Sequence, residues 1–180
     1  MFSALPLSAQ TTWSGLKFGI SSTEAEQALK DRGMTLSERV PYHFTVHPSY
    51  QVELPEVEKP VPFNVELDLS GGGKLKRIEL QLDNQALLSR MGGNYVAMAT
   101  LVNDRMKAAL SAKYGAPVAV KGACESLSDA MLIHGSNVDC EESWKTEGQL
   151  ITVSWGYVQG QGRVLMYYYF LEYLRASPDL

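Results

Sequence analysis

Three histidines are the first residues in the sequence whose type would suit catalysis or metal binding. His43 and His47 lie four residues apart in the strand-like run VPYHFTVHP, where their side chains would point the same way but about 13 Å apart. That separation is too large for one shared metal ion. His134 lies close to Ser136 and Asp139, but a Ser/His/Asp site depends on geometry that closeness in sequence does not provide. The histidines therefore favour solvated strand and loop positions.

Two further patterns favour ordinary structure over chemistry. SGGGK, at 70–74, lacks the spacing and the Lys-Ser/Thr pair of a phosphate-binding loop, and it lies between two alternating apolar runs, which predicts a hairpin turn. Glu141 and Glu142 are adjacent, so on a strand they face opposite sides and form no acid/base pair. We predict no catalytic residue, no metal ligand and no cofactor.

The two cysteines, Cys124 and Cys140, have 15 residues between them in a polar stretch. An even pair at this spacing predicts one disulfide, which on the chain-entropy model would contribute roughly 3 kcal/mol to stability. Two free thiols are the alternative. A zinc site would need two more ligands, and only His134 lies nearby.

Aromatic residues gather in the C-terminal part of the chain, at Trp144, Trp155, Tyr157, Tyr167, Tyr169 and Tyr173. Tyrosine and tryptophan are common at interaction surfaces because they bury a large area while keeping a polar group. Packing in the core beneath the helices is the alternative. We predict that Tyr157, Tyr167 and Tyr169 contribute to an exposed or ligand-facing patch.

The first half of the chain must begin with a helix and continue as strands. Ser21 and Glu24 form a capping box, and Gly33 is a natural residue to end the helix. The residues from 35 to 83 are predicted to be β structure. The alternation of Val40, Tyr42, Phe44 and Val46 predicts one face of a single strand, and the runs 63–69 and 75–82 predict a hairpin with a bulge near Arg77.

The second half repeats this outline. A connector at 83–93 leads to a helix over 95–113, which ends at Tyr114-Gly115, and a strand begins within 117–122. A loop over about 123–143 holds both cysteines, and three strands follow it. The last of these strands is apolar on both faces, which predicts a central place in the sheet or a partner contact.

These elements predict an α+β fold, an antiparallel sheet with two helices packed on one face, because hairpins dominate and no βαβ crossover is evident. The residues 13–180 would form a single domain of two halves, about 13–83 and 94–174. ALKDRGM and ALSAKYGAP each end a helix on glycine and enter β structure. This similarity predicts a duplicated helix-plus-strands unit.

The composition excludes some partners. The chain has 180 residues with 20 acidic and 16 basic side chains, a net charge of −4, which argues against nucleic-acid binding. No apolar stretch is long enough to span a membrane as a helix. The start MFSALPLSAQTT, residues 1–12, is similar to the end of a signal peptide, with an ordinary frayed terminus as the alternative. Together with the expected disulfide, it predicts a periplasmic or secreted protein.

The stretch WSGLKFGIS, at 13–21, followed by EAEQAL at 24–29, resembles the opening of small secreted bacterial domains. These include the outer-membrane assembly small lipoproteins and the β-lactamase inhibitor protein type, and YGAP at 114–117 resembles the exit of such a unit. The resemblance implies helices on an antiparallel sheet, sometimes duplicated. The chain differs in having no lipid-anchor cysteine and no proline after Gly33-Met34, and the resemblance assigns no functional residue.

Three functions fit these observations. The first is a non-enzymatic secreted or periplasmic domain that binds a protein or another envelope component through its sheet face. The second is a carrier that holds a small apolar ligand between the sheet and the helices. The third is a hydrolase that uses His134 or His43, which would require a pocket joining the histidine to a carboxylate or a serine.

Overall fold

The computed structural model describes residues 13–54, 59–70, 72–91, 95–122, 124, 137–146, 148–158 and 161–170. The predicted start at 1–12, and with it the signal-peptide prediction, lies outside the described residues. The elements are, in chain order, η1 (Trp13–Gly15), α1 (Ser22–Lys30), β1 (Thr35–Val40), β2 (His43–Val52), β3 (Val61–Asp68), β4 (Arg77–Leu82), α2 (Asn84–Met91), α3 (Tyr95–Tyr114), β5 (Ala119–Gly122), β6 (Asn137–Lys145), β7 (Gln149–Val158) and β8 (Gln161–Phe170).

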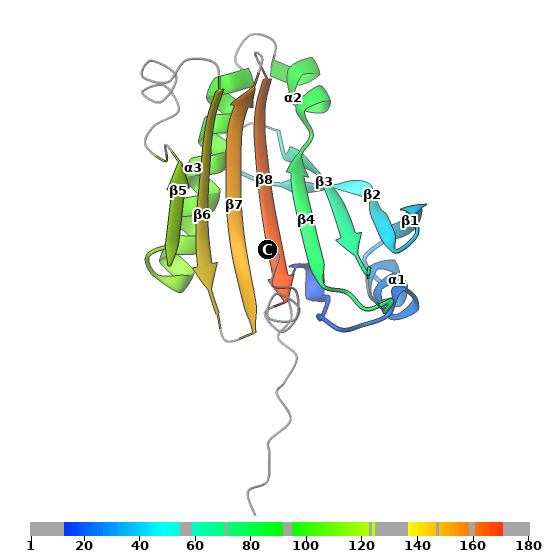
Figure 1. Cartoon of the computed structure of the whole chain (residues 1–180). Coiled ribbons are helices and arrows are strands. Elements are labelled where there is room, and N and C mark those ends of the chain that lie inside the picture. The colour runs from blue at the N-terminus through cyan, green and yellow to red at the C-terminus, as the bar shows by residue number, and fades with distance from the viewer. Residues whose placement is uncertain are drawn as a thin grey trace, which may run out of the picture.

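The described strands form one 8-stranded antiparallel sheet in the order β1-β2-β3-β4-β8-β7-β6-β5 (Figure 1). The first four strands and the last four therefore occupy opposite halves of the sheet, each in sequence order from edge to centre. The two halves meet where β4 pairs with β8, and Glu79 lies opposite Tyr167 at the middle of that pairing. The α+β antiparallel fold and the central place of the last strand are confirmed. The division into domains is untested and stays a prediction.

Helix α3 covers one face of the sheet, over β6, β7 and β8, and it lies behind these strands in Figure 1. We call this face the inner face and the opposite one the outer face. Apolar side chains from both layers are buried between them, which stabilises the fold by about 1.5–3 kcal/mol for each large side chain. The buried residues of these elements include Met98, Ala99, Val102 and Leu110 on α3 and Trp144, Ile151, Val153, Trp155 and Met166 on the strands.

The ends of helices α1 and α3 follow the sequence signals. The Ser21 backbone N–H donates to Glu24 Oε2 at 2.8 Å, and the Glu24 N–H donates to Ser21 Oγ at 3.3 Å, so the predicted capping box is present. Gly33 and Gly115 both have a positive φ, 73° and 84°, beyond the last turn of a helix. Each glycine then leads into an edge strand of the sheet, β1 or β5, which confirms the similar outline of the two halves.

The prediction of a single strand over 40–46 is wrong. Val40 ends β1 and pairs with His43, the first residue of β2, so Pro41 and Tyr42 form a two-residue turn. Val46 is buried in the core, whereas Val40 and Tyr42 are exposed. The period-2 pattern crosses the turn without a break, so alternation alone does not reveal where the chain reverses.

The predicted bulge near Arg77 is also wrong. The β3–β4 register runs without a shift from Phe63↔Leu82 to Asp68↔Arg77. The apparent slip of phase arises because Leu75 lies before β4 rather than in it. Leu75 is buried, and its N–H donates to the carbonyl of Ile20 at 2.8 Å.

Two of the predicted irregular segments contain regular structure. The connector at 83–93 includes helix α2, where the Asp83 carboxylate accepts a hydrogen bond from the Ala86 N–H at 3.0 Å, as a capping residue does. The predicted loop over 123–143 is too long, because β6 begins at Asn137 and Cys140 lies within it. Cross-strand pairing with β7 overrides the polar, loop-like composition of β6.

Candidate binding surface

The outer face carries a row of charged residues across β2, β3 and β4. Because strand side chains alternate between faces, the neighbours of the buried Leu67, Ile78 and Leu80 point away from the inner face. Asp68 pairs in register with Arg77 and with His43, and Glu66 pairs with Glu79. Arg77 Nη2 lies 3.7 Å from Asp68 Oδ2 and 4.0 Å from Glu79 Oε2. These groups form one charge cluster on the first half of the sheet.

Asp68 is the carboxylate at the centre of this cluster. The Ser70 N–H donates to its Oδ1 at 2.8 Å. Burial alone would raise the pKa of Asp68, but the hydrogen bonds from Ser70 and the positive charges of Arg77 and His43 outweigh burial and lower the pKa below its ordinary value. Asp68 therefore stays ionised at neutral pH, beside Arg77 of β4.

His43 does not form a catalytic arrangement with Asp68. The distance from His43 Nδ1 to Asp68 Oδ1 is 3.9 Å, which is beyond hydrogen-bond range, so the carboxylate does not orient the imidazole as in a triad. His47 pairs with Thr35, and four positions along β2 separate it from His43. His134 and Ser136 lie outside the described residues, and Asp139 is exposed.

The predicted tyrosine patch lies on β7 and β8. In register, Tyr167 pairs with Glu79 and Thr152, and Tyr169 pairs with Arg77 and Leu150. Tyr157 pairs with Val138 and Gly162, further along β7. The three side chains are not among the described ones, so their part in a binding patch stays a prediction. Of the other aromatics that sequence singled out, Trp144 and Trp155 are buried in the core, and Tyr173 lies outside the described residues.

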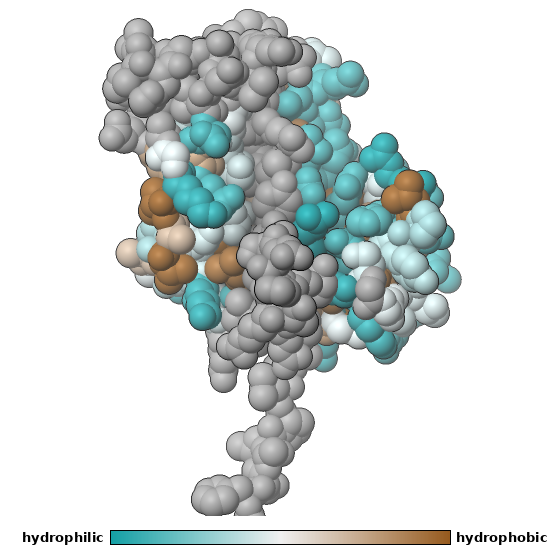
Figure 2. Space-filling view, in the orientation of Figure 1, coloured by the Kyte–Doolittle hydropathy of each residue, from teal (hydrophilic) through white to brown (hydrophobic). Residues whose placement is uncertain are grey.

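The exposed large apolar side chains of the described chain lie at the two edges of the sheet. Val40 and Tyr42, 55% and 51% exposed, stand at the end of β1 and in the turn after it, and Val118 and Val120, 63% and 54% exposed, stand before and in β5. Figure 2 shows hydrophobic groups toward both lateral edges of this face, with hydrophilic residues beside the group on the β1 side. Sequence reasoning missed the first pair, although a proline at the first position of a turn is a recognisable signal.

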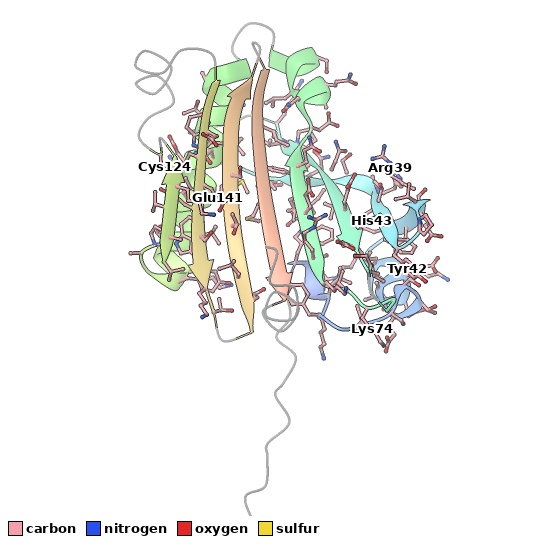
Figure 3. The ribbon with its side chains drawn as sticks, in the orientation of Figure 1. Arg39, Tyr42, His43, Lys74, Cys124 and Glu141 are labelled. Carbon is pink, nitrogen blue, oxygen red and sulfur yellow. A yellow bond between two sulfur atoms is a disulfide. The ribbon has the colours of Figure 1, made fainter. Side chains whose placement is uncertain are left out.

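We call residues 39–43 together with Lys74 the β1–β2 corner, and Figure 3 shows Arg39, Tyr42, His43 and Lys74 there. Arg39 Nη1 donates to Glu66 Oε1 at 3.0 Å, so the corner is tied to the charged row. The side chains of Arg39 and Glu66 are 68% and 41% exposed, so both are accessible to a partner.

The opposite edge holds the disulfide. Cys124 and Cys140 are joined, as predicted, with a Cα–Cα distance of 4.9 Å. Lys121 Nζ lies 3.2 Å from Glu141 Oε1 on the outer face, while Glu142 forms an ion pair with Lys107 of α3, so the two glutamates do face opposite sides. The sulfur atoms and a Glu142 oxygen lie within 4.8 Å of one another, but both sulfurs are used by the disulfide and the carboxylate by Lys107. In the oxidised protein this group therefore has a structural role, because its atoms form the disulfide and the ion pair with α3.

Within the described part of the chain, none of the helices combines the length and the apolar character needed to cross a membrane. No protein-family model, no curated protein and no solved structure matches the chain.

Proposed function

We propose that the protein is a non-enzymatic binding domain that engages a partner protein across the outer face of its sheet. The observation that carries this proposal is the distribution of exposed apolar side chains. Val40 and Tyr42 are exposed at the β1 edge, beside the accessible Arg39–Glu66 ion pair of the outer face. Val118 and Val120 do not count toward this surface, because Val120 pairs in register with Glu142, whose side chain faces α3 on the inner side. Apolar anchors with a polar surround are typical of protein interfaces.

The predicted tyrosines would extend this surface through the centre of the sheet. The positions of Tyr167 and Tyr169 lie next to the charged row of β4, between the two edges. Rings at these positions would supply the large contact area on which hot spots depend. Tyr157 lies two positions beyond the buried Trp155 on β7, so its position belongs to the inner face and Tyr157 is left out of this surface.

We propose a secreted or periplasmic location for this binding. The Cys124–Cys140 disulfide supports it, because disulfides persist in oxidising compartments. Alkylation of intact cells with a thiol-reactive reagent, followed by mass measurement, would check it. Both cysteines should remain unmodified until the protein is reduced, and alkylation of both before reduction would contradict the proposal.

A photo-crosslinking amino acid placed on the outer face tests the binding function. We would introduce p-benzoylphenylalanine at Glu66 and at Tyr167 of the full chain, in the cells that produce it. Ala112 provides the control position, because it is exposed on α3, away from the outer face. The proposal expects one discrete adduct from Glu66 or Tyr167 and none from Ala112. Adducts from Ala112 alone, or from no position, would overturn it.

A second candidate function is the carriage of a small molecule between α3 and the sheet. Two buried polar atoms at this interface, Asn103 Oδ1 and Trp155 Nε1, have no hydrogen-bond partner within the described structure. Such groups are costly unless something satisfies them, and a ligand with both a donor and an acceptor would do so. Native mass spectrometry of the protein from its source should then detect a bound mass that is lost in Asn103→Leu and kept in Ser111→Ala.

A further inference from the structure

The turn between β1 and β2 contains a residue that suits the fold poorly. Tyr42 has a φ of 68°, and the other non-glycine residue with a positive φ among those described is Ser14. A proline followed by a residue with positive φ matches a type II turn, in which glycine is the favoured second residue. A bulky side chain in this backbone region is strained and is therefore a candidate for a functional role.

The backbone of the turn does not depend on the tyrosine ring. The Tyr42 N–H donates to Glu38 Oε1 at 3.0 Å, and its carbonyl accepts from the Leu69 N–H at 2.8 Å. Any residue at position 42 would make both bonds. The ring lies beside the β3–β4 turn, where a Cβ added to Gly73 would be 3.9 Å from Tyr42 Cε1, yet the residue remains 51% exposed. The fold thus carries a strained aromatic residue that leaves half of its surface exposed.

The charges at the corner indicate what the ring would meet. Glu38 is engaged by the Tyr42 N–H, and Glu66 is paired with Arg39. Lys74 is exposed, and it lies near Glu24 of α1, whose pKa is lowered by hydrogen bonds from Ser21 and by the positive charge of Lys74. Each cation of this corner therefore already faces a carboxylate, and a partner would meet charges of both signs around the ring.

We propose that Tyr42, with Val40 beside it, is the anchor that a partner protein buries in an apolar pocket, and that the rim of this pocket carries charges of both signs to match the Arg39–Glu66 pair and Lys74. This inference rests on the proposed binding function and assigns its energetic centre to the β1–β2 corner. Hot spots of protein interfaces are enriched in tyrosine, and a surround of complementary charge directs association.

The first test needs no partner. If Tyr42 serves binding rather than folding, its strained backbone should lower the stability of the free protein. Tyr42→Gly and Tyr42→Asn both relieve the positive φ, and Tyr42→Gly should raise Tm by about 2–4 °C in a chain of this size. Val118→Gly is the control, since it removes an exposed apolar side chain from a residue without a positive φ, and it should leave Tm unchanged or lower it. A Tm of Tyr42→Gly at or below that of the unchanged protein would overturn the inference.

The second test measures binding by the full chain. p-Benzoylphenylalanine at position 42 should yield an adduct whose partner is identified by mass spectrometry and then produced in pure form, since capture alone is not support. Titration calorimetry should show an affinity about 30-fold weaker for Tyr42→Gly and Tyr42→Asn, the size of a hot-spot loss. Val118→Gly should stay within about twofold of the unchanged chain, because Val118 lies outside the outer-face surface.

The remaining outcomes separate this inference from the proposed function. If Glu66 and Tyr167 crosslink to the partner while position 42 does not, or if Tyr42→Gly binds within about twofold of the unchanged chain, the anchor assignment fails and the binding function stands. If none of the three positions crosslinks, both fail. Co-sedimentation with phosphatidylglycerol vesicles that Tyr42→Gly abolishes would assign the corner to a lipid surface and overturn the protein-partner assignment.

Discussion

Lys107 Nζ lies 3.1 Å from Glu142 Oε1, and this ion pair joins helix α3 to strand β6 across the inner face of the sheet. The side chains of Lys107 and Glu142 are only 17% and 13% exposed. Lys107 also donates to the carbonyl of Cys124 at 3.5 Å, so the same ammonium group connects the helix, the sheet and the disulfide-linked segment.

Replacing one member of this ion pair should lower the stability of the fold more than replacing both. Lys107→Met leaves the Glu142 carboxylate poorly solvated and without its partner, and it should lower the free energy of unfolding by on the order of 3 kcal/mol. The double variant Lys107→Met/Glu142→Leu should recover at least half of this loss. Urea denaturation measures both values. Lys121→Met is the control, since its exposed pair with Glu141 should be worth no more than about 0.5 kcal/mol. Equal losses in the two lysine variants would contradict the expected role of burial.

The disulfide should be a large single contribution to stability. Cys124 and Cys140 are 16 positions apart, and the double variant Cys124→Ser/Cys140→Ser should lose about 3 kcal/mol of unfolding free energy on the chain-entropy model. Reduction of the unchanged protein with a phosphine should reproduce the loss. Identical unfolding curves for the oxidised and the reduced protein would show that the cross-link does not constrain the unfolded chain.

Two glycines allow backbone strain to be distinguished from steric contact. Gly19 and Gly122 have similar positive φ angles, 82° and 77°. A Cβ at Gly19 would meet nothing within 4 Å, whereas a Cβ at Gly122 would collide with the backbone oxygen of Asp139. Gly19→Ala should cost about 1 kcal/mol of stability, from the backbone angle alone. Gly122→Ala should cost at least about twice as much. Chemical denaturation of the two variants side by side is the measurement, and equal costs would mean that β5 can move away from β6 freely.

Asp68 should make stability depend on acid pH. Because its pKa is lower in the folded protein than in the unfolded chain, its contribution is complete above the ordinary Asp pKa of about 3.9 and is lost as the pH falls through that value toward the folded pKa. Asp68→Asn should therefore be less stable than the unchanged protein by about 1–2 kcal/mol at pH 7, and the gap should narrow below about pH 4. Urea midpoints from pH 7 to pH 3 would measure the gap. Glu66→Gln, an exposed control, should show little difference, and a gap for Asp68→Asn that widens in acid would reverse the expected sign.

Local signals in the sequence correctly predicted the helix ends and the disulfide. Ser21 and Glu24 suffice to start α1, and Gly33 and Gly115 to end α1 and α3, because capping depends on residues within one turn of each other. The Cys124–Cys140 bridge followed from there being one cysteine pair in the chain.

The features that the sequence did not predict depend on contacts between residues that are far apart along the chain. The turn at Pro41-Tyr42 could not be recognised from the sequence pattern, because Val40 and Tyr42 continue the apolar alternation of β2. In the structure both residues are exposed rather than buried. The polar start of β6 becomes a strand because β7 pairs with it. The charge cluster arises because register brings Asp68 beside both His43 and Arg77, and no pattern within one strand encodes a register.

The strand order has a consequence for how the chain folds. Six of the strand pairings described, within β1–β4 and within β5–β8, join neighbours along the chain, and β4–β8 is the one that joins distant segments. Pairing Glu79 with Tyr167 closes a much longer loop than the sequential hairpins do, so its loop-entropy cost is larger. Each half-sheet should therefore assemble early and the seam between β4 and β8 should close last. Until it closes, two long strand edges rich in apolar side chains stand open, so aggregation during folding should begin at this seam.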